Sequence, residues 1–504
     1  MFDLLQQIYL GFSVAFIPTN LLFCFIGVFL GTLVGVLPGL GPAATISLLL
    51  PITFNLRPET ALIMIAGIYY GAQYGGSTTS ILVNIPGEAS CVVTCLDGYQ
   101  MARQGRAGPA LGISAFGSFI GGTLSVIGLM LLGPMLANFA LEFGPPEYFA
   151  LMLLGIVILT FLSSGSMVKS LISAAIGLFV GTIGLDTIYG VQRFTYGSLT
   201  LMDGVGLIPV AMGLFGIAEV LTNLEQKEVR DVFKTELRGL FPTRKDWRES
   251  IGPILRGSLI GFSLGILPGG GAIMSSFTSY AIEKRVSHHP ETFGRGAIAG
   301  VAGPETANNA ATGGAMIPLL SLGIPSNIIM ALLIGAMMIH GIRPSCFLVK
   351  EHPQVFWGVI SSMYVGNILL LVLNLPLIGL WVKLLRVPYG ILFPLILLFC
   401  LIGVYTINTN PNEMLVMLIF GLIGYVMRKA RFEPAPLVFA MVIGPIMETA
   451  LRQTLLHSRG KFNVFLARPI SAVLLIVSVI LLLCPLIPQL RRRRDRMVKE
   501  ASEE

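Results

Sequence analysis

Residues 257–272 read GSLIGFSLGILPGGGA, and residues 303–325 read GPETANNAATGGAMIPLLSLGIP. Each is an apolar helical segment that is broken by a proline, at Pro268 in the first and at Pro325 in the second. Backbone that stops being helical inside a membrane is tolerated only where protein buries it or where it lines a wet cavity. Two such breaks in one stretch predict a transporter's substrate site.

The composition is that of a membrane protein. Of the 504 residues, 54% are hydrophobic and 12% are charged, whereas globular chains are about 25% charged. Nearly uncharged windows such as residues 391–407 are long enough to cross a bilayer. The sequence therefore predicts an all-α polytopic membrane protein with about 11–12 transmembrane helices.

The pattern of the opening stretch occurs twice. Residues 27–41 carry glycines at every fourth position and end in Leu-Pro-Gly-x-Gly, as residues 257–271 do. This spacing places the glycines on one helix face, where another helix can approach closely. A second pair of matching segments follows, at residues 75–86 and 313–325. Two matched pairs at a nearly constant offset indicate an internal duplication.

The duplication divides the chain. A polar linker (224–250) separates the two copies, and because it is rich in Lys and Arg we place it in the cytoplasm. Counting the helices on either side of it predicts two inverted repeats with broken or re-entrant helices. Arg452, Arg459 and Lys461 fall outside the cytoplasm in this scheme, which counts against it. The predicted parts are a first membrane repeat (1–223), a cytoplasmic linker (224–250), a second repeat (251–456), and an extra C-terminal helix with a basic tail (457–504).

The basic tail, with five arginines in residues 491–496, follows an apolar helix. A cytoplasmic membrane anchor explains this position better than nucleic-acid binding does, because basic residues favour the cytoplasmic side of a membrane. We therefore expect no nucleic-acid partner. The first residues, MFDLLQQIYLGF, lack a basic region and a cleavage site, so we expect them to be retained.

The two Leu-Pro-Gly-x-Gly turns lack the Lys-Ser/Thr of a phosphate loop. One interpretation is a pair of kinks that pack tightly; the other, which we favour, is a pair of flexible tips whose backbone amides face an anion. The candidate substrate-binding residues from these turns and from the second break are Pro38, Gly39, Gly41, Pro268, Gly269, Gly270, Gly271 and Pro325.

Small polar side chains precede the Ile-Pro break in both halves. Hydrogen bonding between helices is the ordinary use of such residues in membranes, but here they cluster beside Gly-Gly pairs, and we interpret them as walls of the site. They are Ser77, Thr78, Thr79 and Asn84 in the first half and Asn308, Asn309 and Thr312 in the second.

Carboxylates at membrane depth are costly and point to function. Glu305 adjoins the second polar cluster, so we interpret it, with Asn308 and Asn309, as a candidate for binding a coupling H⁺ or Na⁺. We expect Glu219 and Glu448 instead to end helices at the membrane interface. No other metal, and no cofactor, is predicted.

The segments GVLPGLGPAATISLLLP (35–51), YYGAQYGGSTTSILVNIPGE (69–88) and the two quoted first resemble the large membrane subunit of tripartite tricarboxylate transporters, the TctA family. The resemblance covers nearly the whole chain. It implies a multi-pass permease of the bacterial inner membrane that works with a small membrane subunit and a periplasmic solute-binding protein. It also implies uptake of citrate or another di- or tricarboxylate, driven by an ion gradient.

Three classes of function remain to be compared. A channel would need an open pore, often with a charged ring or a filter, whereas paired breaks in inverted halves favour a secondary carrier. An intramembrane metalloprotease would need a motif such as H-E-x-x-H, which the sequence lacks. We therefore expect a binding-protein-dependent symporter, driven by Na⁺ or H⁺, and not an enzyme; a channel is the alternative.

Overall fold

The computed structural model describes residues 2–37, 41–162, 166–186, 188–225, 239–269, 271–384, 389–408 and 410–483. Within these ranges the regular secondary structure is helical apart from one short antiparallel pair, β1 (Gly184–Leu185) and β2 (Gln192–Arg193). Five helices are long and apolar enough to cross a membrane, and eight shorter apolar helices accompany them in the same ranges. The predicted all-α polytopic membrane fold is confirmed.

The first half begins with a helix that the sequence did not lead us to expect, α1, and its last long helix contains a π-helical segment, η2, between α10 and α11. The elements are α1 (Phe2–Ala15), α2 (Pro18–Val36), α3 (Pro42–Thr53), α4 (Pro58–Val83), η1 (Ala89–Cys91), α5 (Val92–Arg103), α6 (Ala107–Ala140), α7 (Pro145–Leu162), α8 (Met167–Gly181), α9 (Leu199–Met202), α10 (Leu207–Ala211), η2 (Met212–Ile217) and α11 (Ala218–Glu225).

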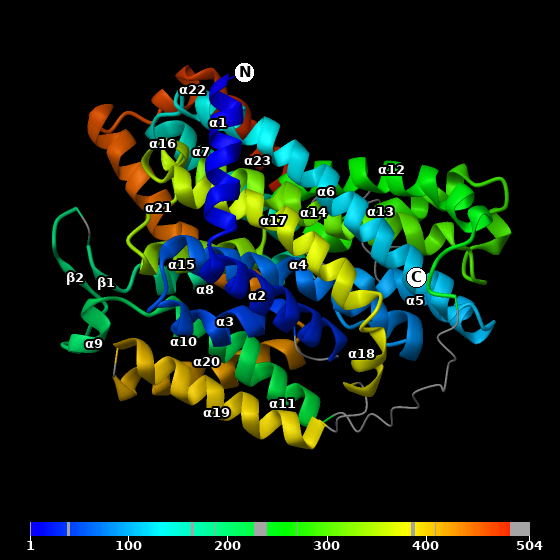
Figure 1. Ribbon diagram of the computed structural model, residues 1–504. Helices are drawn as coiled ribbons and strands as arrows, with labels where there is room; N and C mark the ends of the chain where they lie inside the picture. The colour runs from blue at the N-terminus through cyan, green and yellow to red at the C-terminus, as the bar shows by residue number, and fades with distance from the viewer. Residues whose placement is uncertain are drawn as a thin grey trace.

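Within the described residues the second half is also built of long and short helices, and one further apolar helix follows it (Figure 1). The elements are α12 (Arg244–Ile266), α13 (Gly271–Val286), η3 (Pro290–Thr292), α14 (Ala299–Leu322), α15 (Ile328–Ile339), α16 (Leu348–Glu351), α17 (Pro353–Asn374), α18 (Ile378–Leu384), α19 (Tyr389–Asn408), α20 (Pro411–Lys429), α21 (Ala435–His457), α22 (Val464–Ala467) and α23 (Pro469–Leu483). Linker residues 226–238 and the tail from residue 484 lie outside the described ranges.

The glycine stripes act as predicted, by letting backbones meet. α2 packs on α4, and a Cβ at Gly31 would lie 2.5 Å from the carbonyl oxygen of Ile68. α12 packs on α14 in the same way, and a Cβ at Gly257 would lie 2.5 Å from the carbonyl oxygen of Gly303. Only glycine permits such close helix contact, so each half is built on one glycine-mediated helix pair.

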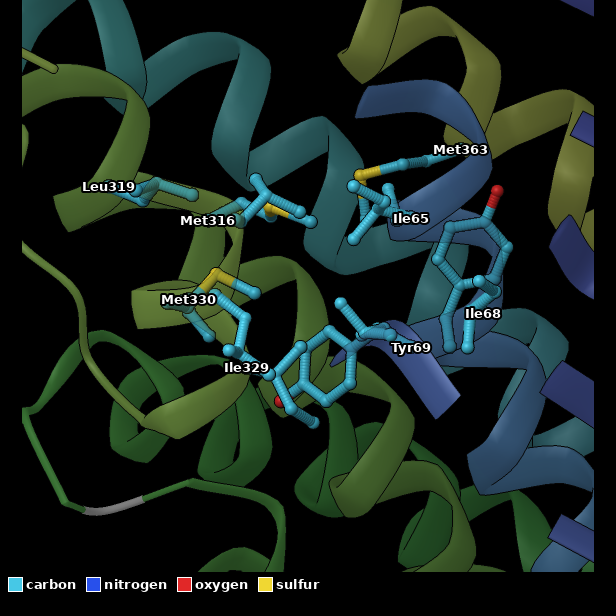
Figure 2. Close-up of a cluster of buried hydrophobic side chains, with 14 of the residues drawn as sticks. Ile65, Ile68, Tyr69, Met316, Leu319, Ile329, Met330 and Met363 are labelled. Atoms are coloured by element: carbon cyan, nitrogen blue, oxygen red, sulfur yellow. The ribbon is translucent and has the colours of Figure 1, made fainter. Parts of the chain in front are cut away.

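The two halves share one core. Figure 2 shows side chains of α4, Ile65 and Tyr69 among them, facing Met316 of α14, Met330 of α15 and Met363 of α17. Methionine fills irregular gaps because its side chain is unbranched. The contact between α4 and α14 therefore lies inside the core and not on its edge.

Helices are also exchanged between the halves. α8 of the first half packs against α21 of the second, and α20 of the second packs against η2 of the first. The last long helix of the first half contains η2, and that of the second half is α21. In each half, the helix before this last one (α8 or α20) therefore packs on the last helix of the other half. Such reciprocal packing is what a two-fold relation between repeats produces. The orientation of each half in the membrane stays a prediction.

Several ion pairs join the halves, and two of them involve Glu219 and Glu448. Glu219 of α11 contacts Arg428 of α20 at 2.5 Å, and Glu448 of α21 contacts Arg193 of β2 at 2.7 Å. Both glutamates lie within continuing helices, α11 and α21, so the prediction that they end helices is wrong; an arginine from the other half neutralises each of them. Arg452 contacts Asp186 at 2.6 Å and, by this hydrogen bond, lowers the pKa of Asp186 to about 2.

Candidate functional site

Glu305 lies where the matching helices of the two halves approach each other. Its side chain is fully buried on α14. Ser77 of α4 donates a hydrogen bond to one carboxylate oxygen and Thr94 of α5 donates to the other, while Nδ2 of Asn308 lies 3.4 Å away. The two predicted polar clusters, one from each half, therefore meet at a single carboxylate.

The remaining candidates of the first half lie next to Ser77. Thr79 is buried and donates to the carbonyl oxygen of Val36 at 2.8 Å, which ties α4 to the end of α2. Thr78 is buried as well. Asn84 has a left-handed backbone, with φ of 59°, and terminates α4 two residues before Pro86.

The candidates on α14 differ in what they contact. Asn309 donates through Nδ2 to Oδ1 of Asn308 at 2.6 Å and to the carbonyl oxygen of Glu305 at 3.1 Å. Thr312 donates to the carbonyl oxygen of Asn309 at 2.7 Å. Asn308 and Asn309 thus extend the polar cluster around Glu305. The Thr312 hydrogen bond stays within its own helix, which is the ordinary use of a buried threonine.

The second-half turn is held at Gly269 by a hydrogen bond to the break after α14. α12 ends at Ile266, Pro268 follows, and Gly269 has φ of 77°. The Gly269 amide donates to the carbonyl oxygen of Ser326 at 2.8 Å, so this amide is already used by the chain. Ser326 directly follows Pro325, which places the Leu-Pro-Gly turn against the break after α14.

The first-half turn is described only in part. Pro38 and Gly39 lie outside the described residues, as does Gly270 of the other turn. Gly41 precedes α3 with φ of −75°, and Gly271 begins α13 with φ of 40°. A Cβ at Gly87, just after the first Ile-Pro break, would collide with the carbonyl oxygen of Gly35. In both halves, therefore, the end of the glycine helix rests on the break that follows α4 or α14.

Several residues of the site were missed from the sequence. Ser118 of α6 donates to the carbonyl oxygen of Glu305 at 3.2 Å, and Ser114, one turn earlier, hydrogen-bonds to the carboxylate. Nδ2 of Asn308 lies 3.7 Å from the sulfur of Cys91. The spacing of four between the two serines, on a helix rich in glycine, was the available signal. Nothing in the sequence pairs Thr94 with Glu305.

The chemistry of this site is that of neutral hydrogen bonding around one buried carboxylate. Among the described residues, no Lys, Arg or His forms an ion pair with Glu305. The same ranges contain no group of three or more His, Cys, Asp or Glu that could hold a metal ion. Such a carboxylate can hold a proton or a small cation, and the surrounding hydroxyl and amide groups can bind polar solutes.

Residues 21–439 match the family described as "Tripartite tricarboxylate transporter TctA family". The chain belongs to the TctA family. It is a multi-pass membrane protein and a large subunit of the tricarboxylate-transporter class, as the resemblance in the sequence predicted.

Two proteins of Agrobacterium vitis are similar to this TctA chain over long stretches. An uncharacterized 52.8 kDa protein in the TAR-I ttuC' 3' region is 49% identical over 500 residues, which cover 99% of this chain and 100% of that protein. An uncharacterized protein in the TAR-II ttuC' 3' region is 48% identical over 240 residues, 48% of this chain and 99% of that protein. No solved structure matches.

Proposed function

We propose that this TctA protein is the permease subunit of a secondary transporter that imports citrate or another di- or tricarboxylate across the bacterial inner membrane, driven by a Na⁺ or H⁺ gradient. The observation that carries the proposal is Glu305, a fully buried carboxylate that accepts hydrogen bonds from Ser77 of the first half and Thr94. Intramembrane carboxylates of this kind bind coupling ions in transporters.

Coupling of ion binding to transport requires a site whose contacts depend both on the bound ion and on the arrangement of the two halves. Ser77 reaches Glu305 from α4, and α4 and α14 are the matching helices of the two repeats. A change in the charge of Glu305 therefore alters a contact between the repeats. The interrupted backbone after each helix supplies the polar groups that a carboxylate substrate needs.

We assign substrate capture to partner subunits. Neutral hydrogen bonds contribute only about 0.5–1.5 kcal/mol each, while removing the charges of a carboxylate from water costs much more unless cations compensate. The site around Glu305 is formed by Ser, Thr and Asn, so it holds an anion weakly without a coupling cation. A periplasmic solute-binding protein for capture and a small membrane subunit complete the proposed transporter.

The test is uptake of a panel of radiolabelled di- and tricarboxylates by the complex reconstituted in proteoliposomes, with an imposed Na⁺ or H⁺ gradient. We expect gradient-driven accumulation and counterflow of at least one carboxylate. Glu305→Gln keeps the shape of the side chain and removes its charge, and it should lower accumulation by at least about tenfold. Glu291→Gln, at an exposed glutamate of η3, is the control.

A flux without counterflow would support a channel instead. Full accumulation by Glu305→Gln would exclude Glu305 as the coupling carboxylate. Full-rate uptake without a binding protein would contradict the assignment of substrate capture to a partner.

A further inference from the structure

A small polar cavity adjoins the Glu305 site and belongs to both halves of the protein. It is lined by Tyr74, Ser77 and Thr78 of α4, by Leu111, Ser114 and Ala115 of α6, and by Asn374 of α17. The volume of this cavity that the centre of a water-sized molecule can occupy is about 10 Å³. This is close to the ~10–15 Å³ that a single water molecule needs, so the space suits one small occupant.

Two of the lining residues carry an oxygen that lacks a hydrogen-bond partner among the described residues, namely Oη of Tyr74 and Oδ1 of Asn374. The two residues are only 3% and 4% exposed. Nδ2 of Asn374 donates to the carbonyl oxygen of Leu370 at 2.9 Å, which leaves its oxygen as the free end of the amide. Buried polar atoms without a partner are rare in native proteins, and each calls for an occupant.

The charge next to the cavity decides the kind of occupant. Ser77 and Ser114 line the cavity and also hydrogen-bond to Glu305. When the Ser77 hydroxyl donates to the carboxylate, its lone pairs remain available to a cation. Burial disfavours the ionised form of Glu305, and a cation in the adjacent cavity would stabilise the charge on this carboxylate.

We propose that a Na⁺ ion binds in this cavity, ligated by Oη of Tyr74, Oδ1 of Asn374 and the neighbouring hydroxyl oxygens, with Glu305 compensating its charge. Hard cations prefer oxygen ligands of this kind. The inference rests on the proposed ion-driven transport and specifies its coupling site. Because Asn374 comes from the second half and Tyr74 from the first, the ion would bind only when α4 and α17 are in this arrangement.

The experiment measures Na⁺ binding by the purified protein through calorimetric titration and through its thermal stability. NaCl, KCl and choline chloride are compared at equal ionic strength. We expect Na⁺ alone to raise the Tm of the wild-type protein. Tyr74→Phe and Asn374→Leu remove one oxygen each while keeping side-chain volume, and each should weaken Na⁺ binding by at least about tenfold. Ser361→Ala is the matched control, since Oγ of Ser361 on α17 is also buried and has no partner in the described part of the chain, but lies against Gly11 of α1.

The outcomes separate this inference from the proposed function. Equal effects of Na⁺ and choline, or unchanged Na⁺ binding in both cavity variants, would overturn the inference and leave water as the occupant. An equal effect of K⁺ would overturn the assignment to Na⁺. Carboxylate uptake that persists without Na⁺ and is unaffected by the cavity variants contradicts the inference alone. Intact Na⁺ binding without any carboxylate uptake contradicts the proposed function alone.

Discussion

The two Leu-Pro-Gly turns have nearly the same sequence, yet the helices that follow them pack differently. α13 folds back along α12 and also packs on α14, whereas α3 has its main contacts with α15, α19 and η2. An apolar cavity of about 650 Å³ lies among α2, α3 and α19. One turn therefore forms a closed hairpin and the other an open one.

The helix behind each turn explains the difference. A Cβ at Gly303 of α14 would lie 2.9 Å from Oγ of Ser279 and from Cγ of Glu283 on α13, so the absence of a side chain admits α13. The glycine contacts set the alignment of the two helix pairs: an added Cβ at Gly27 meets the carbonyl oxygen of Met64, and one at Gly257 meets that of Gly303. The residue of α4 that corresponds to Gly303 is therefore Met64, which is only 2% exposed and whose side chain fills space that Gly303 leaves open to a helix.

The comparison shows that a duplicated motif fixes the turn but not the path of the chain after it. α3 carries no charged residue and can lie among apolar helices, as its sequence PAATISLLLPIT indicates. α13 buries Glu283 and pairs it with Arg256 of α12, at 2.8 Å and 2.5 Å. A glycine on one helix and a carboxylate on the next thus close the second hairpin.

The largest effect is expected from placing the first-half residue in the second half. Gly303→Met should displace α13 and destabilise the protein by about 3 kcal/mol, because overpacking a tight contact costs ~1–3 kcal/mol and occasionally more. Hydrogen exchange over residues 271–286 should increase, as measured by mass spectrometry. Gly379→Met, where no atom lies within 4 Å of the added Cβ, is the control. Unchanged exchange in Gly303→Met would show that Gly303 does not close the hairpin.

A smaller effect is expected from breaking the ion pair of the closed hairpin. Arg256→Gln leaves the carboxylate of Glu283, only 2% exposed, without its partner. Because the Arg256 side chain is 41% exposed, we expect a loss of about 2 kcal/mol, less than for a fully buried pair. The measurement is the free energy of unfolding by SDS titration in mixed micelles.

The matched control for this variant is Lys245→Gln on the same helix. Lys245 pairs with Glu249, and both side chains are well exposed, so this variant should change stability by less than about 0.5 kcal/mol. A loss of the same size in both variants would mean that the Arg256 pair contributes no more than a surface contact.

Features that depend on neighbouring residues could be predicted from the sequence, whereas features that depend on contacts between distant residues could not. The glycine stripe and the Leu-Pro-Gly turn are local patterns, and the helix ends at Ile266 and Val36 agree with them. The meeting of Ser77 with Glu305 followed from treating matched segments as one site. The opening of the first hairpin depends on Met64, far along the chain, and could not be inferred from the turn itself.

The cavity oxygen of Asn374 was missed for the same reason. It is the last residue of α17, in a segment without any motif, and only the packing of α17 beside α4 and α6 gives it a role. Glu219 and Glu448 were misjudged because their arginine partners belong to the other half. Contacts between the halves are not encoded in either half alone.

The smallest expected effect compares equivalent glycines of the two turns. Gly271 has φ of 40° and Gly41 has φ of −75°, and no atom lies within 4 Å of an added Cβ at either position. An added methyl group therefore meets no neighbouring atom at either position, and the two sites differ only in their backbone conformation.

Gly271→Ala forces alanine into the left-handed region and should cost about 1 kcal/mol. Gly41→Ala adopts an ordinary conformation and should change stability by less than about 0.5 kcal/mol. Both are measured as the free energy of unfolding under the same conditions, with uptake recorded alongside. Equal losses in the two variants would mean that the turns share one backbone conformation and that the hairpins differ only in the helices behind them.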